Sequence, residues 1–136
     1  MSQVIILTNQ VSQELAPGQS LTFSMVILRT GCAECYRQGS GAVILRKPNA
    51  IYGIDFSGNI GATAPGVAEL SIMINGSPLI ETPMISTTAA AGDVNNVSKR
   101  TAVQTCCCGP ETCTVVNTGE TSVVVENPLL FIKRVA

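Results

Sequence analysis

Six cysteines in two short segments, together with the absence of histidine, limit the chemistry open to this chain. The segment GCAECY contains Cys32 and Cys35, and the segment TCCCGPETC contains Cys106, Cys107, Cys108 and Cys113. Thiolates bind zinc or form disulfides, and buried thiols act as small apolar side chains. Without imidazole, a Ser–His pair, a Cys–His pair or a histidine-ligated metal cannot occur within one chain. The cysteines therefore indicate a structural role.

Three structural roles remain open. A four-thiolate zinc site would use the Cys-x-x-Cys pair and the distant cluster, with the ligands Cys32, Cys35, Cys108 and Cys113. Disulfides, which we favour, have as candidates Cys32, Cys35, Cys106, Cys108 and Cys113. The specific pairing that we predict joins Cys32 or Cys35 to Cys108 or Cys113. Such a bridge closes a loop of about seventy residues and contributes roughly 4 kcal/mol. Free buried thiols are the third role.

Other features of the same residues argue against catalysis. Strand alternation sends Cys107 to the opposite face from Cys106 and Cys108, so Cys107 is predicted to lie in the core or in a different contact. Cys32 and Cys35 are not expected to form a thioredoxin-like redox pair, because the residues after them do not form a helix. The carboxylates are scattered and form no glycosidase pair. We predict a protein that is not an enzyme and that has no cofactor, unless the thiolates bind structural zinc.

The composition predicts a single domain, residues 1–136, that associates with copies of itself. A chain of 136 residues has the size of one ordinary domain. Charged residues make up 12% of it, about half the usual share, whereas apolar residues make up 46%. A monomer with so few charges would expose much apolar surface. Part of that surface is therefore expected to be buried between protomers.

Charge and hydropathy also predict what the chain does not bind. The net charge of -1 gives no electrostatic reason to bind nucleic acid or an acidic membrane. No apolar run approaches the roughly 20 residues of a membrane span. The N-terminal sequence MSQVIILTNQ lacks the basic region and cleavage site of a secretory signal. We expect synthesis in the cytoplasm, with cell lysis as one route to display outside the cell.

Strand-like windows alternate with turn residues along the whole chain, and no amphipathic helical period persists for three turns. The windows are 4–8, 21–27, 42–45, 51–56, 67–74, 79–85, 94–104, 114–117, 122–126 and 129–135. Asn75-Gly76 is the strongest hairpin signal, and Pro83 suits an edge strand. Turns are predicted at Ala16-Pro17-Gly18, Lys47-Pro48-Asn49 and Ser57-Gly58-Asn59. This regular spacing predicts an all-β jelly-roll sandwich of about ten strands.

Several strands are apolar at consecutive positions, so both of their faces carry apolar side chains. They are Val4 to Leu7, Ala42 to Leu45, Val123 to Val125 and Leu129 to Ile132. These strands could be central ones that their own chain covers on both sides. A two-layer sandwich has no third layer to supply that cover, so burial between protomers is the better account. We expect Ile, Val and Leu of the N-terminal and C-terminal strands to dominate the contact.

The segment GVAELSIMINGSPLIETPMIS and the ending VVVENPLLFIKRVA resemble the C-terminal domain of collagen-like exosporium glycoproteins of spore-forming bacteria. Those domains are tumour-necrosis-factor-like jelly rolls. In them, a strand of the form L-x-I-x-V-N-G-x-P and a terminal strand take the places of Leu70 to Pro78 and Phe131 to Ala136. The resemblance covers about residues 40–136, and no collagen stalk is present. It implies a tumour-necrosis-factor-like homotrimer whose axis is lined by apolar strands.

Related stand-alone jelly rolls decorate phage particles, so the resemblance also suggests a function. We expect a structural protein on the surface of a virion, as a phage capsid decoration or fibre protein with the major capsid protein as a partner. A spore-surface protein is the second candidate. A carbohydrate- or receptor-binding module is the third, although few aromatic residues, Tyr36 among them, are available to stack on sugars.

Overall fold

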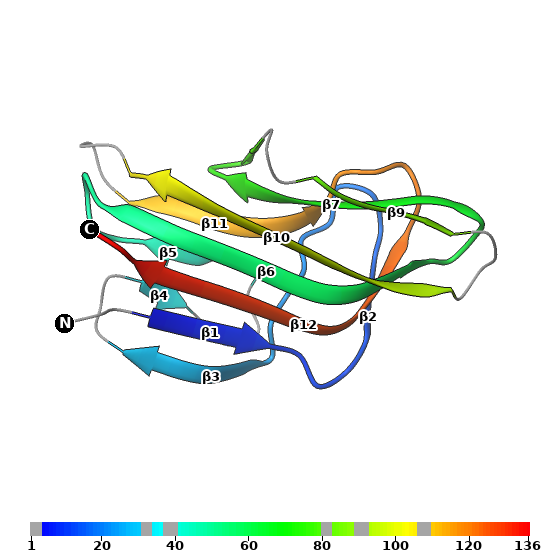
Figure 1. The fold of residues 1–136 in the computed structure, drawn as a ribbon, viewed down its shortest axis with the longest axis horizontal. Helices are drawn as coiled ribbons and strands as arrows, with labels where there is room; N and C mark the ends of the chain where they lie inside the picture. The colour runs from blue at the N-terminus through cyan, green and yellow to red at the C-terminus, as the bar shows by residue number, and fades with distance from the viewer. Residues whose placement is uncertain (1–3, 31–33, 37–40, 80–82, 89–92, 106–109) are drawn as a thin grey trace.

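The computed structural model describes residues 4–30, 34–36, 41–79, 83–88, 93–105 and 110–136. These residues form two antiparallel sheets packed face to face (Figure 1). They contain no helix long and apolar enough to cross a membrane. The predicted all-β jelly-roll sandwich is confirmed, with twelve strands in the described residues where about ten were expected.

Sheet A is the nearer layer in Figure 1 and has the strand order β10-β6-β12-β1-β3. A further short strand, β2, pairs with β12. The bounds are β1 Val4–Thr8, β2 Gln13–Leu15, β3 Met25–Thr30, β6 Ile51–Ala62, β10 Val94–Gln104 and β12 Val123–Arg134. The N-terminal strand β1 and the C-terminal strand β12 are therefore neighbours, five residues in register from Val4↔Lys133 to Thr8↔Leu129.

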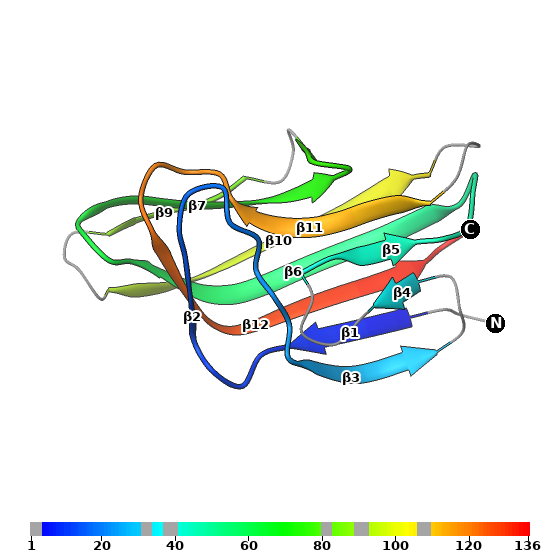
Figure 2. The ribbon, with the colours of Figure 1, turned by 180° about the vertical axis from the view of Figure 1, so that it is seen from behind.

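Sheet B is the nearer layer in Figure 2 and has the strand order β4-β5-β11-β7-β8, with β9 also paired to β7. The bounds are β4 Glu34–Tyr36, β5 Val43–Leu45, β7 Gly66–Ile74, β8 Ser77–Pro78, β9 Met84–Thr88 and β11 Glu111–Asn117. Pro83 immediately precedes β9, whose only paired neighbour among the described strands is β7, so the predicted edge position is confirmed.

The core lies between the sheets and follows the period-two pattern of the sequence. In β6, alternate residues from Tyr52 to Ile60 are buried, and the residues between them face outward. Tyr52, Phe23 and Phe56 are the largest fully buried side chains. Because alternation assigns one face of each strand to this core, the other face of every strand lies outside it.

The hairpin predicted at Asn75-Gly76 is confirmed. Its two residues have φ angles of 53° and 82°, and they connect β7 to β8 with Ile74 aligned to Ser77. Positive φ at both central residues is the geometry of a type I′ turn, which matches the twist of the flanking strands. The turns at Ala16-Pro17-Gly18 and Lys47-Pro48-Asn49 also form, with positive φ at Gly18 and Asn49.

The turn predicted at Ser57-Gly58-Asn59 is wrong, because β6 continues through it to Ala62. These turn-forming residues stay in the strand because β6 pairs with a long strand on each side. β10 pairs with β6 from Ile51 to Gly61, and β12 pairs with it over almost the same length. The backbone hydrogen bonds of those two ladders outweigh the weak turn preference of the three residues. The two glycines Gly58 and Gly61 are therefore strand residues.

Gly61 and Gly58 provide a matched test of this strand. A Cβ atom at Gly61 would lie 2.5 Å from the carbonyl oxygen of Asp93, whereas at Gly58 its nearest neighbour would be the Cα of Pro128 at 3.4 Å. We expect Gly61→Ala to lower the free energy of unfolding by about 1–3 kcal/mol, since backbone must move. Gly58→Ala should change it by less than about 1 kcal/mol. Denaturant titration of both variants measures this; equal effects would contradict it.

The strand predicted from Leu21 to Ile27 begins only at Met25. Before Met25, backbone N–H groups donate to side chains instead of to a neighbouring strand. The Gln13 side chain accepts a hydrogen bond from the Thr22 N–H at 2.9 Å, and the Asn9 side chain accepts one from the Ser24 N–H at 2.6 Å. The segment before it crosses to sheet B, where the Leu21 N–H donates to Val115 O at 2.7 Å (Figure 2). Leu21 is buried as its pattern indicates, but the chain changes sheets around it.

Candidate subunit interface

The outward face of sheet A carries the apolar side chains that the doubly apolar strands predicted. Outward-facing residues align across the strands in register rows. The central row runs across β3, β1, β12, β6 and β10 as Leu28, Ile6, Phe131, Asp55 and Arg100. The row on one side of it is Met25, Thr8, Leu129, Ser57 and Ser98, and on the other side Thr30, Val4, Lys133, Gly53 and Ala102. We call these fifteen residues the sheet A face.

The sheet A face is asymmetric across its strands. Its central row is apolar on β3, β1 and β12 and charged on β6 and β10. Beyond the face, toward the far end of the sheet, the next row is polar: Glu126 aligns with Asn59, whose amide oxygen accepts from the Asn96 amide at 3.0 Å. The apolar area is therefore bounded by polar residues on two sides, as is typical of a specific interface.

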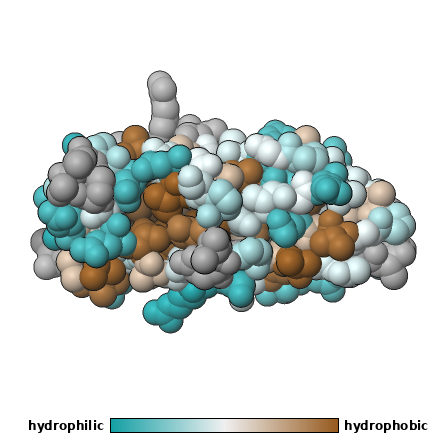
Figure 3. All heavy atoms as spheres, turned by 90° about the horizontal axis from the view of Figure 1, so that it is seen from above, coloured by the Kyte–Doolittle hydropathy of each residue, from teal (hydrophilic) through white to brown (hydrophobic). Residues whose placement is uncertain are grey.

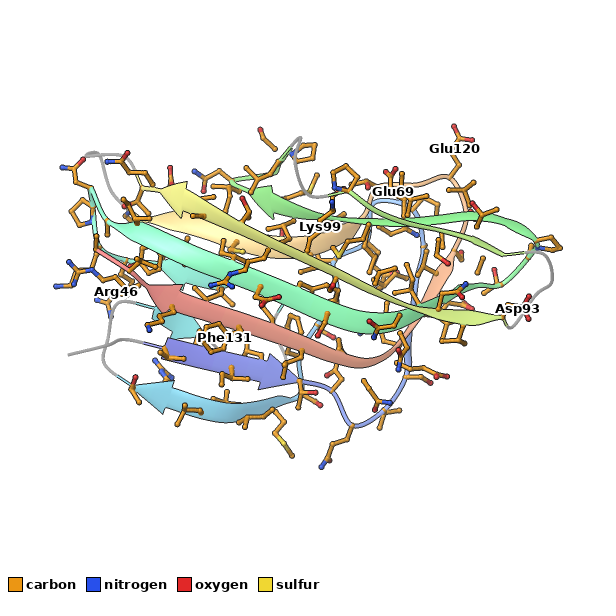
Figure 4. The ribbon with its side chains drawn as sticks, in the orientation of Figure 1. Arg46, Glu69, Asp93, Lys99, Glu120 and Phe131 are labelled. Carbon is orange, nitrogen blue, oxygen red and sulfur yellow. The ribbon has the colours of Figure 1, made fainter. Side chains whose placement is uncertain are left out.

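A hollow of about 290 Å³ lies at the boundary between the apolar and charged parts of the sheet A face. Its walls include Phe131, Leu129 and Val135, with Asp55, Arg100 and Lys133 as the charged groups. Leu129 is 37% exposed and Val135 is 64% exposed in the protomer. Figure 4 places Phe131 on the near surface of sheet A, away from Glu69 and Glu120. This surface is open in a single chain.

The edge strand β3 extends the apolar surface beyond the face. Ile27, which is not part of the face, is 52% exposed, and its neighbour Leu28 in the central row is 46% exposed. The register of β1 and β3 shifts between Ile6 and Leu7, so Ile27 is an extra residue opposite that step. Such a bulge twists an edge strand and turns its side chains outward. The period-two pattern of the sequence predicts that Ile27 lies on the same face as buried Phe23. The bulge instead turns Ile27 away from the core.

The outward face of sheet B differs from that of sheet A. Its exposed apolar side chains, Ile44, Val67 and Ile85, lie on three strands, of which β5 is separated from β7 by β11. Between them lies a polar chain in which Thr118 donates to the Glu69 carboxylate at 2.6 Å and lies 2.9 Å from the Ser71 hydroxyl. The doubly apolar segment Ala42 to Leu45 thus lies in sheet B, whereas the other three doubly apolar segments lie in sheet A. One flat contact cannot cover the outward faces of both sheets.

The open upper edge of the sandwich, seen in Figure 3, is a mixed surface on which brown apolar side chains lie among teal polar ones. Val103 of β10, Ile74 of β7 and Leu79, which follows β8, are partly buried and pack against the core.

Cys113, one of the predicted disulfide and zinc candidates, is a free thiol buried in the core. It aligns with Val43 of β5, whereas Cys35 aligns with the next residue, Ile44, from the opposite side of that strand. Because β5 lies between them, the two Cα atoms are about 10 Å apart, beyond the reach of a disulfide. The strand order therefore argues against a bridge between Cys35 and Cys113 within one chain, and the other predicted pairings stay predictions.

Burial raises the pKa of the Cys113 thiol from 9.0 to about 12. The thiolate is the reactive form, so we expect Cys113 to resist alkylation by iodoacetamide at mildly alkaline pH in the folded protein. The raised pKa also means that stability falls as pH rises from about 9 toward 12, because only the unfolded chain then loses the proton. Peptide mapping with and without guanidinium measures the labelling; rapid labelling of the folded protein would contradict the prediction.

The other thiol predictions stay predictions. Cys32, Cys106, Cys107 and Cys108 lie outside the described residues, and Cys35 is described only as part of the β4 backbone. No group of three potential metal ligands occurs among the residues that the structure describes. Glu34 and Glu111, which lie within the two cysteine segments, both align with Leu45. Thiol counting with metal analysis distinguishes disulfide, zinc and free thiols.

Comparison with known proteins identifies the class of fold. No protein-family model and no curated protein sequence matches this chain. Solved structures that it resembles include murine APRIL at pH 8.0, with a TM-score of 0.70 and 10% identity over 99% of this chain and 100% of that one. The Eiger TNF structure from S. frugiperda gives 0.69 and 8% over 100% and 92%. The globular domain of zebrafish complement 1qA gives 0.67 and 10% over 96% and 94%.

The chain therefore has the tumour-necrosis-factor-like jelly-roll fold that its sequence resemblance implied. At this level of identity, the comparison shows the fold alone.

Proposed function

We propose that the protein is a non-enzymatic structural module that assembles as a homotrimer through the sheet A face. The observation that carries the proposal is the apolar area on β1, β12 and β3, which includes half-buried Ile6 and Phe131 and exposed Leu28 and Leu129. A chain with 12% charged residues has few polar side chains with which to keep such a face in water. Covering it with a second copy removes that apolar area from solvent.

The number of copies rests on the resemblance, and the geometry is compatible with it. The central row of the face is apolar at one end and charged at the other. A ring of three copies joins unlike surfaces of neighbouring protomers, so an asymmetric face suits it. A twofold dimer would instead require one patch that is complementary to itself.

We further propose that the trimer is part of a particle surface, as a phage capsid decoration or fibre protein bound to the major capsid protein. The support is the absence of histidine and of a paired-carboxylate site in the sequence, together with the low charge. A spore-surface location and a carbohydrate- or receptor-binding role are the alternatives. Of the aromatic residues, Tyr52, Phe23 and Phe56 lie in the core, which leaves few for stacking on a sugar.

Light scattering coupled to size exclusion tests the assembly. We expect about three times the chain mass of 14.2 kDa at micromolar concentration. A soluble monomer at that concentration would refute the proposal. Electron microscopy of intact phage particles, with labelled antibody against this chain, tests the location: density on the capsid or fibre supports it, and labelling of spores alone assigns the chain to the spore surface.

A further inference from the structure

One carboxylate in the middle of the sheet A face, that of Asp55, has no partner among the described residues. Asp55 is half-buried at the centre of β6, between Ile54 and Phe56, which point into the core. Its side chain makes no hydrogen bond or ion pair with any residue in the described part of the chain. The same holds for the guanidinium of Arg100 on β10, which is exposed.

The surroundings of Asp55 are apolar on one side and basic on the other. Phe131 aligns with it from β12, and Arg100 aligns with it from β10. Among the described residues, Lys133 is the only other charged one that lines the same hollow. Aligned residues of opposite charge on neighbouring strands commonly pair. In this protomer, Asp55 and Arg100 are neighbours that do not form an ion pair.

Assembly through this face changes the energetics of both groups. A second copy that covers Phe131 and Leu129 also removes water from Asp55, which lies in the same hollow. A carboxylate that loses its water is destabilised unless a cation pairs with it, and neither Arg100 nor Lys133 of the same chain forms an ion pair with Asp55. A guanidinium placed against it supplies both the charge and hydrogen bonds. The face is therefore suited to a copy that brings a base to Asp55.

We propose that Asp55 of each protomer forms an ion pair with Arg100 of the next protomer, and that this pair fixes the register of the assembly. The inference rests on the proposed trimer. In a closed ring, each copy gives its acid to one neighbour and its base to the other, so all of these groups are paired. The occupant of the hollow is thus a second copy of this chain, recognised by charge complementarity with Asp55 and Arg100.

Subunit exchange with a charge-reversed variant tests the pair directly. In the double variant Asp55→Arg/Arg100→Asp, copies attract one another as before. A contact between that variant and the unmodified chain places two acids or two bases together. We expect the double variant to form trimers with itself but to form almost no mixed trimers with an affinity-tagged unmodified chain. Native mass spectrometry after incubation measures the mixture.

The control is the same exchange between tagged and untagged copies of the unmodified chain. These copies should form mixed trimers in statistical proportions. If the double variant mixes equally well, the pair does not cross the interface and the inference is overturned while the trimer stands. A monomeric unmodified chain would instead refute the proposed function itself. These two failures are therefore distinguishable.

A double-mutant cycle covers the case in which charge reversal prevents folding. Asp55→Asn and Arg100→Gln each remove one charge with little change in shape. Each should raise the dissociation constant about 30-fold or more, because the remaining charge stays buried and unpaired. The double variant should raise the dissociation constant by much less than the product of the two single fold-changes. Strictly multiplicative effects would overturn the inference; circular dichroism of each variant checks its fold.

Discussion

Phe131→Lys is expected to convert the proposed trimer into monomers while leaving the protomer folded. Phe131 is half-buried on the outward face of β12 and aligns with Asp55, so a lysine there faces an acid in the single chain. In the assembly, the substitution removes a buried aromatic side chain and introduces a long charged one at the centre of the contact. The combined cost is about 4 kcal/mol or more, which raises the dissociation constant roughly 1000-fold.

Ile85→Lys is the matched control for that substitution. Ile85 is also an outward apolar residue aligned with an acid, Glu69, but it lies on β9 in sheet B. It is 57% exposed in the protomer. Light scattering at equal concentration should show a trimer for Ile85→Lys and a monomer for Phe131→Lys. Dissociation by the control alone would move the interface to sheet B, and a trimer in both would remove Phe131 from the contact.

Asn117→Ala is expected to lower the free energy of unfolding by about 3–4 kcal/mol, because buried backbone groups lose their partners. Asn117 is fully buried at the end of β11. Its amide group donates to Leu15 O at 3.0 Å and to Thr121 O at 2.8 Å, and its carbonyl accepts from the Gly119 N–H at 3.0 Å. One side chain therefore joins the strand β2 of sheet A to the loop that leads into β12.

Gln19→Ala is the control for the loss of a polar side chain in the same region. Gln19 accepts a hydrogen bond from the Ala16 N–H at 2.9 Å, but water can replace this exposed contact. The expected cost is below about 1 kcal/mol. Both variants must be compared at one protomer concentration, because association adds to apparent stability. Similar denaturation midpoints for the two would show that the buried network of Asn117 contributes little.

Much of the fold could be predicted from the sequence because its rules act over a few residues. Asn75 and Gly76 specify their hairpin, since both accept positive φ at little cost. Alternation in Ile51 to Phe56 identifies which side chains of β6 enter the core. The apolar outward positions of β1 and β12 also follow from alternation, so an apolar outward face on these two strands was predictable.

The tertiary structure decided which of those segments meet. Local preference at Ser57 to Asn59 favours a turn, but pairing with β10 and β12 extends the strand. Cys113 could not be separated from the other thiols by spacing, and only the order β4-β5-β11 places it out of reach of Cys35. The candidate ion pair was not predictable for the same reason. Asp55 and Arg100 are both ordinary outward strand residues, and their alignment beside Phe131 depends on the register of three strands far apart in sequence.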